Sequence, residues 1–356
     1  MPNKGARATI RVVAERCGFS TTTVSRVMQD PSFGAADTRR RVLKTAAELG
    51  WVPNGAARGL ASHKAGIIGL LFPDLGQSGA AEEQSPLYVD EVIRGAERVA
   101  TLAGEAILIA AVRAASRRAL AYSVASKVDG LVIMARSLSE KDITAIARSV
   151  PVVLLATKPG RQALDHVAVD NRAGAREVTN HLIEAHGYRD LAFVSGPAGS
   201  PDSAERFAGF CEGLTSAGIP QPALPAADGG FTDKGGAKAM RLLLSGGRTP
   251  RAVVFGNDEM AIGALGVLRE ANLQVPDDVA VSGFDDIAIA RHVSPALTTA
   301  HQPMRELGEQ AVQLLFSRLR EPASSRRAVL LSTNLVVRES CGCRQKVQLA
   351  TATRDL

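Results

Sequence analysis

Aromatic residues are scarce in this 356-residue chain, and long apolar runs are missing from it. Phe, Tyr and Trp together make up 4% of the residues, and only one Trp is present. No apolar stretch reaches the roughly 18 residues that a membrane-spanning helix needs, so we expect no membrane partner. The N-terminus is polar and basic and lacks the apolar core of a signal peptide. These absences predict a cytoplasmic protein.

Cysteine is also rare, because the chain has four Cys and they are too scattered for a disulfide framework. Cys341 and Cys343 form a lone C-x-C motif, which we interpret as part of a solvated tail rather than as a metal site. His181 and His186 are five residues apart, the wrong spacing for two metal ligands on one helical face. The sequence therefore predicts no metal and no cofactor.

Motifs of the common enzyme classes are missing too. The chain has no P-loop, no H-E-x-x-H zinc motif and no G-x-S-x-G nucleophile elbow, and its six histidines are scattered. We therefore expect that the protein is not an enzyme.

The positive charge that is present is concentrated at the N-terminus. Residues 1–64 contain eleven Lys or Arg and four acidic residues, a difference of +7. The remainder holds 31 basic and 32 acidic residues, a difference of −1. A polyanion partner for the N-terminal segment is the simplest explanation.

Apolar residues in this basic segment recur at helical spacing, which predicts three short helices. Gly18 ends the first helix, Ser20 is a good N-cap for the second, and Gly50 stops the third. The residues expected to face inward are Ile10, Val13, Ala14 and Cys17, then Val24, Val27 and Met28, and finally Val42, Leu43, Ala46 and Leu49. Two helices joined by a tight glycine turn, with a third completing the core, indicate a helix-turn-helix domain in residues 1–52.

The second helix of this domain is predicted to be the recognition helix. Thr21, Thr22 and Arg26 face away from the core, and their side chains suit contacts with base edges, with Arg forking onto guanine. A helix surface without such a role would more often carry Glu and Lys. Thr23 and Ser25 are expected to contact phosphates, which position the protein without specifying sequence.

Several N-terminal segments resemble the signature of the lac repressor (LacI/GalR) family of transcriptional regulators. They are Thr9–Ala14, Ser20–Val27, Thr38-Arg39, Glu48–Asn54 and Ala57–Leu60. The resemblance implies a sequence-specific, DNA-binding regulator in which Thr9 and Ser20 join the DNA contacts. A homodimer is expected, because two recognition helices then read the two halves of a pseudo-palindromic operator.

Residues 53–64 are predicted to be a hinge. Gly55 and Gly59 each cost about 1 kcal/mol relative to Ala in a helix, so we expect this linker to become helical only on DNA. The resemblance implies that Asn54, Ala57 and Leu60 contact the operator. Leu60 would enter the minor groove at a central C·G-G·C step and kink the duplex. The alternative, in which Leu60 packs against the core domain, stays open.

From Gly66 onward, apolar strands alternate with amphipathic helices, which predicts parallel sheets with right-handed crossovers. The expected strands are Ile67–Phe72, Ala106–Val112, Gly130–Ala135, Val150–Ala156, His166–Val169, Leu191–Ser195, Ala252–Phe255, Val279–Gly283, Thr298–His301 and Ala328–Val337. So many strands indicate two sheets with a cleft between two lobes. The resemblance likewise implies a periplasmic-binding-protein-like α/β core over residues 65–340, with three crossings between the lobes. Residues 341–356 are expected to form a flexible tail.

Polar residues stand where several of these strands end, the position at which open α/β sheets bind ligands. Asp and Asn there are also common helix N-caps, and we expect Asp258 to be one. The resemblance implies that the small-molecule effector contacts Tyr88, Arg206, Phe231, Asn257 and Asp285. A carboxylate, an Arg and an amide among aromatic faces suit a sugar. The segment from Leu75 to Pro86 is longer than the family usually has and is expected to be a flexible loop at the cleft mouth.

The sequence thus predicts a repressor of carbohydrate-utilisation genes that a small sugar or glycoside releases from its operator. A regulator that depends on a purine or another metabolite as co-repressor is the alternative. Residues 199–202 lack the extra Arg that purine-binding members of the family carry there. A secreted sugar-binding protein would share the core, but the basic helix-turn-helix argues against it.

Overall fold

The computed structural model describes residues 8–30, 32–52, 64–73, 86–113, 116–157, 164–247 and 249–343. The chain divides into two compact units, Met1–Gly66 and Ile67–Leu356. The predicted hinge contacts Asn54, Ala57 and Leu60 lie outside the described residues, as do residues 75–85 of the predicted loop, and the expectations for them remain predictions.

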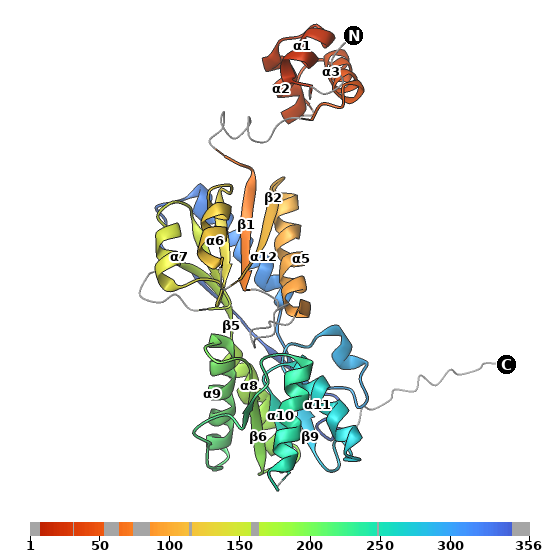
Figure 1. The fold of residues 1–356 in the computed structure, drawn as a ribbon, viewed down its shortest axis with the longest axis vertical. Helices are drawn as coiled ribbons and strands as arrows, with labels where there is room; N and C mark the ends of the chain where they lie inside the picture. Colours follow the sequence, from red (N-terminus) through yellow and green to blue (C-terminus); the bar gives the residue numbers. More distant parts are fainter. Residues whose placement is uncertain are drawn as a thin grey trace, which may run out of the picture. The chain divides into compact units, whose positions relative to one another are not determined.

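The described part of the first unit contains three helices, α1 (Ile10–Cys17), α2 (Thr21–Gln29) and α3 (Ala36–Glu48) (Figure 1). Gly18 ends α1 in the left-handed region, at φ 73°, and the Ser20 side chain caps α2 by accepting a hydrogen bond from the Thr23 backbone N–H. The buried core residues are Val13, Ala14, Cys17, Val24, Val27, Val42 and Ala46. The predicted three-helix domain is therefore present.

Leu43 departs from the expected core of this unit, because its exposed fraction is 50%. Thr45 is buried instead. Successive helical residues are rotated by about 100°, so Val42, Thr45, Ala46 and Leu49 share one face and Leu43 turns toward solvent. The expectation that Leu43 faces inward was wrong.

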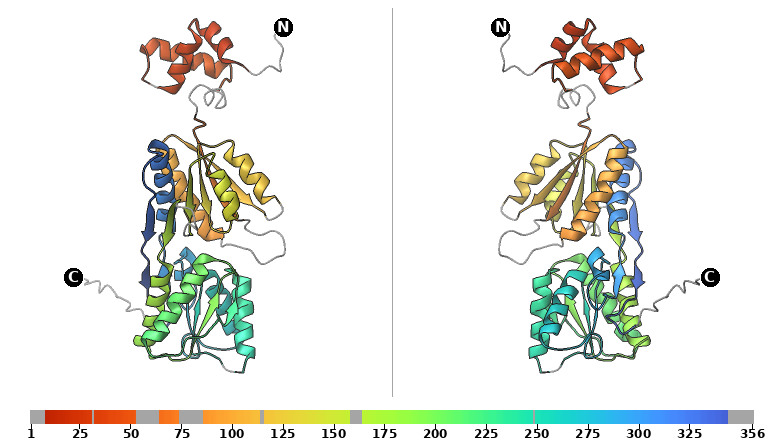
Figure 2. Two further views of the ribbon diagram at one scale, coloured as in Figure 1. Left: turned by 90° about the vertical axis from the view of Figure 1, so that its left-hand side faces the viewer. Right: turned by 90° about the vertical axis from the view of Figure 1, so that its right-hand side faces the viewer.

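The second unit has two lobes. The first lobe is built around a six-stranded parallel sheet in the order β11-β5-β4-β3-β1-β2. Its strands are β1 (Ile67–Pro73), β2 (Ala106–Val112), β3 (Gly130–Met134), β4 (Val152–Leu155), β5 (Asp165–Val169) and β11 (Ala328–Leu331). Helices α5 (Pro86–Leu102) and α12 (Met304–Arg320) cover one face, and α6 (Arg117–Ala125) and α7 (Glu140–Ile146) cover the other (Figure 2). Alternate strand residues point to opposite faces, so each face has its own apolar core.

A second parallel sheet, in the order β7-β6-β8-β9, forms the other lobe. Its strands are β6 (Leu191–Ser195), β7 (Ala227–Asp228), β8 (Ala252–Phe255) and β9 (Ala280–Ser282). Helices α8 (Asn171–Glu184) and α9 (Pro201–Ser216) pack on one face, and α10 (Asp233–Ser245) and α11 (Asp258–Glu270) pack on the other (Figure 2). The sequence analysis did not predict β7, which has only two residues and no recognisable periodicity.

The chain crosses between the lobes three times, as predicted: from β5 to α8, from β10 (Thr299–His301) to α12, and from β11 to β12 (Asn334–Val336). The single strand predicted over Ala328–Val337 is two strands. β11 joins the first sheet, whereas β12 pairs with β10 in antiparallel fashion. A short 3-10 helix, Ala288–Arg291, follows β9. Among the described residues, no helix is both long and apolar enough to cross a membrane.

Candidate functional site

A pocket in the second unit is lined by residues of both lobes and of a segment that connects them. It brings together all five residues predicted to contact an effector and adds two more. The lining residues are Tyr88, Asp202, Arg206, Phe231, Asn257, Asp285 and Gln302. Tyr88 comes from α5 in the first lobe, Gln302 follows β10 at a crossing, and the other five belong to the second lobe.

The polar side chains nearly fill this pocket. Its volume is about 30 Å³, which is enough for one water molecule. Drug-sized ligands occupy pockets of about 300–1,000 Å³. A small molecule can therefore bind here only if side chains or lobes rearrange.

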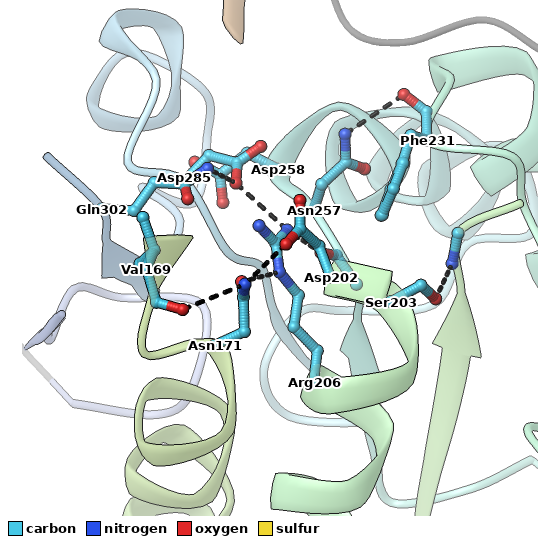
Figure 3. A network of polar contacts seen from close by, with 12 residues as sticks. Val169, Asn171, Asp202, Ser203, Arg206, Phe231, Asn257, Asp258, Asp285 and Gln302 are labelled. Carbon is cyan, nitrogen blue, oxygen red and sulfur yellow. Dashed lines mark hydrogen bonds and ion pairs between the residues drawn. The ribbon is translucent and has the colours of Figure 1, made fainter. Parts of the chain in front are cut away.

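Arg206 is the centre of the network (Figure 3). It lies in the second turn of α9, where only 3% of its surface is exposed. Its Nε donates to the Asn171 side-chain oxygen at 2.8 Å, and its Nη1 donates to the Gly256 carbonyl and, at 3.1 Å, to Asp285. A buried guanidinium is stable only with such partners, because desolvating an unpaired charge is costly.

Asp285 follows β9 and is held in an unusual backbone conformation. Its φ is 119°, in the region that favours glycine, and such strain is concentrated at functional sites. Its carboxylate also accepts a hydrogen bond from the Gln302 side chain at 2.6 Å. Burial raises the pKa of Asp285 to about 7, although the charge of Arg206 lowers it and the acids Glu259 and Asp202 raise it further. This carboxyl group can therefore gain or lose a proton near neutral pH.

Asn257 and Phe231 are fixed by each other. Asn257 caps α11 by accepting a hydrogen bond from the Met260 N–H at 3.1 Å, and it donates to the Phe231 carbonyl at 3.1 Å. Phe231 has a φ of 64° and packs its ring against Gly196, where a Cβ would lie 2.3 Å from that ring. Asn257 thus combines the two roles that the sequence left as alternatives, since it is a helix cap that also lines the pocket.

Asp258 is not the helix cap that the sequence predicted. Asn257 occupies that position, and Asp258 is the first residue of α11. Its fully buried carboxylate accepts hydrogen bonds from the Ile287 backbone N–H and the Thr299 hydroxyl, so it ties the second lobe to the crossing strand. Burial raises its pKa well above the ordinary value, and the nearby Asp285 raises it further.

Sequence reasoning missed Asp202 and Gln302 as pocket residues, and it assigned no role to Asn171, which contacts the same network. Asp202 lies in the first turn of α9, and the Asn171 amide donates to its carboxylate at 2.8 Å. Asn171 therefore bridges Asp202 and Arg206 (Figure 3). The sequence signal for this network was a polar residue, Asn171, directly after β5. It was not enough to identify the partners of Asn171, because they lie on a helix about thirty residues further along the chain.

A second candidate surface lies on the first unit, along α2. The predicted base-reading residues Thr21, Thr22 and Arg26 are all exposed, whereas Thr23 and Ser25 are half-buried. The guanidinium of Arg26 lies 5.5 Å from the centre of the Phe33 ring, which supports the long side chain. The pattern of exposure matches the predicted division between outward-facing residues and the core.

Two further described residues that are predicted to contact DNA, Thr9 and Ser20, stand at helix starts. Thr9 precedes α1 and is exposed, with no side-chain capping hydrogen bond. Ser20 is exposed as well, but its hydroxyl is already shared between the Thr23 backbone N–H at 3.1 Å and the Thr23 hydroxyl at 2.9 Å. Helix N-termini carry partial positive charge, so both positions suit a phosphate.

The fold and these two surfaces define a class: a helix-turn-helix protein with a two-lobed, periplasmic-binding-protein-like core. Residues 9–54 match the family described as bacterial regulatory proteins, lacI family, and residues 179–341 match a periplasmic binding protein-like domain.

Individual relatives extend the match to nearly the whole chain. The HTH-type transcriptional repressor PurR of Pasteurella multocida is 30% identical over 94% of this chain and 98% of its own length. Catabolite control protein A of Priestia megaterium is 31% identical over 93% of this chain and 98% of its own. The chain belongs to the lacI family and is a transcriptional regulator.

Solved structures agree with this assignment. The lac repressor dimer bound to operator and the anti-inducer ONPF is 28% identical, with a TM-score of 0.80, over 94% of this chain and 99% of that one. A complex of the transcriptional regulator CelR with cellobiose is 30% identical, with a TM-score of 0.69, over 94% and 100% of the two chains.

Proposed function

We propose that this regulator is a dimeric repressor that binds a pseudo-palindromic operator and is released from it by a sugar or small glycoside. The observation that carries the proposal is the buried Arg206–Asp285 pair, surrounded by the side chains of Asp202 and Gln302. Carboxylates accept and guanidinium or amide groups donate, so such a set can bind two neighbouring hydroxyls at once. The rings of Tyr88 and Phe231 supply the apolar faces that sugar rings need.

The comparisons support a small-molecule effector of this kind. The CelR structure is a cellobiose complex, and a further lacI-family regulator, from Enterococcus faecium, was solved with bound ribose. That regulator is 25% identical, with a TM-score of 0.69, over 77% of this chain and 98% of its own. The lac repressor structure contains operator, a ligand and two copies of the chain. We infer that this chain likewise binds a small-molecule effector, an operator and a second copy of itself.

Release from DNA would follow from a population shift. The pocket has room for about one water molecule, so a ligand stabilises only conformations in which the lobes or side chains have rearranged. We infer that those conformations misalign the two hinges of the dimer, which then cannot fold together on the operator. A coupling of about 1–3 kcal/mol gives roughly 5–150-fold weaker DNA binding.

A purine co-repressor is the second candidate function. It is favoured by the 30% identity to PurR over nearly the full chain. A nucleobase requires flat stacking surfaces together with groups that match its edge, and the Arg that purine-binding members carry is missing from residues 199–202. The charged lining of the pocket therefore favours the sugar.

One experiment separates the two candidates. An operator is first selected from random duplex DNA with the full-length protein, and sugars and purines are then screened for thermal stabilisation and for their effect on operator affinity. We expect that at least one sugar stabilises the protein and lowers its affinity for the operator. If purines alone stabilise it and tighten DNA binding, the co-repressor function replaces our proposal.

A further inference from the structure

Two histidines and two cysteines that are distant in sequence converge on one point of the second lobe, on elements that do not line the effector pocket. They are His181, His186, Cys341 and Cys343, and their nearest ligand atoms all lie within 4.8 Å of one another. Of the described residues, this is the only group of His, Cys, Asp or Glu side chains with a geometry that could hold a metal ion.

The elements that carry these residues explain why sequence spacing did not predict the cluster. His181 lies in the last turn of α8, which ends at Glu184, so His186 belongs to the following loop and is free of helical geometry. Cys341 was expected to start a solvated tail, but it is fully buried, in a turn that follows β12. The assumption that both histidines share one helix was the error.

Three of the distances between ligand atoms are close to those of a tetrahedral metal site. His181 Nε2 lies 3.4 Å from Cys341 Sγ and 3.7 Å from Cys343 Sγ, and His186 Nε2 lies 3.4 Å from Cys343 Sγ. With Zn–S bonds of about 2.3 Å and Zn–N bonds of about 2.0–2.1 Å, the N-to-S edge of a regular tetrahedron is about 3.5 Å. These three distances already match that edge to within tenths of an ångström, and the whole set, which lies within 4.8 Å, needs to contract by at most about 1 Å to surround a zinc ion.

The chain around the cluster holds it in this arrangement. Gly342 has a φ of 110°, and a Cβ at this position would lie 3.1 Å from both His186 Nδ1 and the Tyr188 hydroxyl. The Tyr188 hydroxyl donates to the Cys341 carbonyl at 3.0 Å, and the Tyr188 ring stacks on His186 with centroids 5.3 Å apart. Glycine between the two cysteines thus lets both sulfurs turn toward the histidines.

We propose that His181, His186, Cys341 and Cys343 bind one Zn²⁺ ion in a closed, structural Cys₂His₂ site. Four protein ligands fill a tetrahedral shell and leave no position for a substrate, which is the hallmark of a structural rather than a catalytic zinc site. Each cysteine releases its thiol proton to solvent as its sulfur bonds to zinc, so two thiolates neutralise the charge of the ion.

The ion would clamp the end of the core to the second lobe. Cys341 and Cys343 follow the last crossing strand, β12, whereas the two histidines belong to α8 and the loop that leads to β6. Three of the four ligands are half-buried, which leaves zinc a path from solvent. Zinc binds only the native arrangement of these distant segments, so it should stabilise the folded second unit by linkage.

The test uses untagged full-length protein that is purified with a reductant and stripped with a chelator. After equilibration with Zn²⁺ and removal of excess metal, mass spectrometry of the metal content is expected to find one equivalent per chain. Co²⁺ in its place is expected to give intense visible d–d bands and a thiolate-to-cobalt charge-transfer band. Zinc is expected to raise the unfolding temperature by about 5 °C when its concentration is about 100 times the dissociation constant.

Matched variants identify the ligands. Cys343→Ser and His186→Gln are expected to lose the bound equivalent and the cobalt spectrum, while Cys211→Ser and His292→Gln, which change the same residue types elsewhere, keep both. A wild-type protein that binds no zinc would overturn the proposal. Equal loss of bound metal in the Cys343 and Cys211 variants would also overturn it, as would a Cys341–Cys343 disulfide that persists in protein purified with a reductant.

Discussion

The guanidinium carbon of Arg206 lies 3.8 Å from the centre of the Phe284 ring. The residue after Phe284 is Asp285, which accepts a hydrogen bond from the same guanidinium. One short segment after β9 therefore supplies both a π-face and a carboxylate to Arg206, and it fixes the charge at the centre of the pocket before any ligand arrives.

The first prediction concerns the role of Asp285 in the response to an effector. Asp285→Asn keeps the shape of the side chain but removes its charge. A hydrogen bond to a charged group contributes about 1.5–3 kcal/mol, so the sugar that stabilises the wild type should bind roughly 10-fold or more weakly. Operator affinity without effector should change little, since Asp285 belongs to the second unit.

Isothermal titration with that sugar and operator binding by fluorescence anisotropy measure the two effects. Glu270→Gln is the matched control, because Glu270 forms an exposed ion pair with Arg241 outside the pocket. An Asp285→Asn protein that responds to effector like the wild type would remove Asp285 from the binding site.

The second prediction concerns the dependence of stability on pH. The pKa of Asp285 is about 7 in the folded chain, against about 3.9 in an unfolded one. The native state thus keeps a proton that the unfolded chain releases, and this stabilisation is complete below pH of about 4 and is lost as the pH rises through about 7. In that window the free energy of unfolding should fall by at most about 1.4 kcal/mol per pH unit from this group.

Urea denaturation of the full-length protein at several pH values between about 4.5 and 7.5 checks this slope. Asp285→Asn should flatten it. Some slope should remain, because burial also raises the pKa of Asp202 and Asp258. Identical slopes for wild type and variant would show that Asp285 does not titrate in this range.

The third prediction concerns a buried ion pair in the first lobe. Asp165 accepts hydrogen bonds from Arg318 at 2.7 and 3.0 Å and from the Arg327 backbone at 2.8 Å. Burial alone would raise the pKa of Asp165, but these hydrogen bonds and the charge of Arg318 hold it below the ordinary value. Arg318→Met should lower the free energy of unfolding by up to roughly 3–5 kcal/mol, because the buried carboxylate then keeps only the Arg327 N–H and the partly exposed Arg326, whose Nη1 lies 3.8 Å away.

Arg241→Met is the matched control for Arg318→Met. It breaks an ion pair whose side chains are 60% and 66% exposed, and such a pair is worth about 0–1 kcal/mol. The two variants are compared by urea denaturation at neutral pH. Equal losses would mean that burial does not set the strength of the Asp165–Arg318 pair.

The fourth prediction concerns base recognition by α2. Arg26 is exposed on the outward face of the helix, and an Arg–guanine fork is worth about 1–3 kcal/mol of discrimination. Arg26→Ala should therefore relax the preference at one position of each operator half-site. Selection from random duplexes reads out the consensus, and Arg40→Ala, which removes an exposed side chain paired with Asp37 on α3, should leave it unchanged. The same consensus for Arg26→Ala and wild type would exclude base reading by Arg26.

The fifth prediction concerns Leu60, which lies outside the described residues and is argued from the sequence. Leu60→Ala should weaken specific operator binding strongly while the salt dependence of binding stays nearly the same, because no phosphate contact is lost. Leu102→Ala changes a leucine that is 80% exposed on α5 and should have no effect. Wild-type operator affinity for Leu60→Ala would show that no wedge exists.

Local patterns in the sequence determined most of the secondary structure. Helical periodicity, Gly18 and the Ser20 cap place α1 and α2 within the first unit, and apolar runs place β2, β6 and β8 at the predicted bounds. These signals arise between residues a few positions apart, so they can be read from a single chain. These patterns predicted the wrong burial for Leu43, because adjacent residues of a helix point in different directions. They also did not predict β7, which has only two residues.

The family resemblance alone predicted five residues of the candidate site, and the tertiary structure brings them into one pocket. It alone decided that Asp202 and Gln302 complete that pocket, because β-strands and helices distant in sequence meet at the carboxyl ends of the second sheet. It alone placed Cys341 and Cys343 against His181 and His186, about 160 residues earlier in the chain. Rules on the sequence spacing of metal ligands apply to residues on one helix or strand. These four side chains meet because β12 pairs with β10 in the second lobe and so places the residues that follow it beside the two histidines.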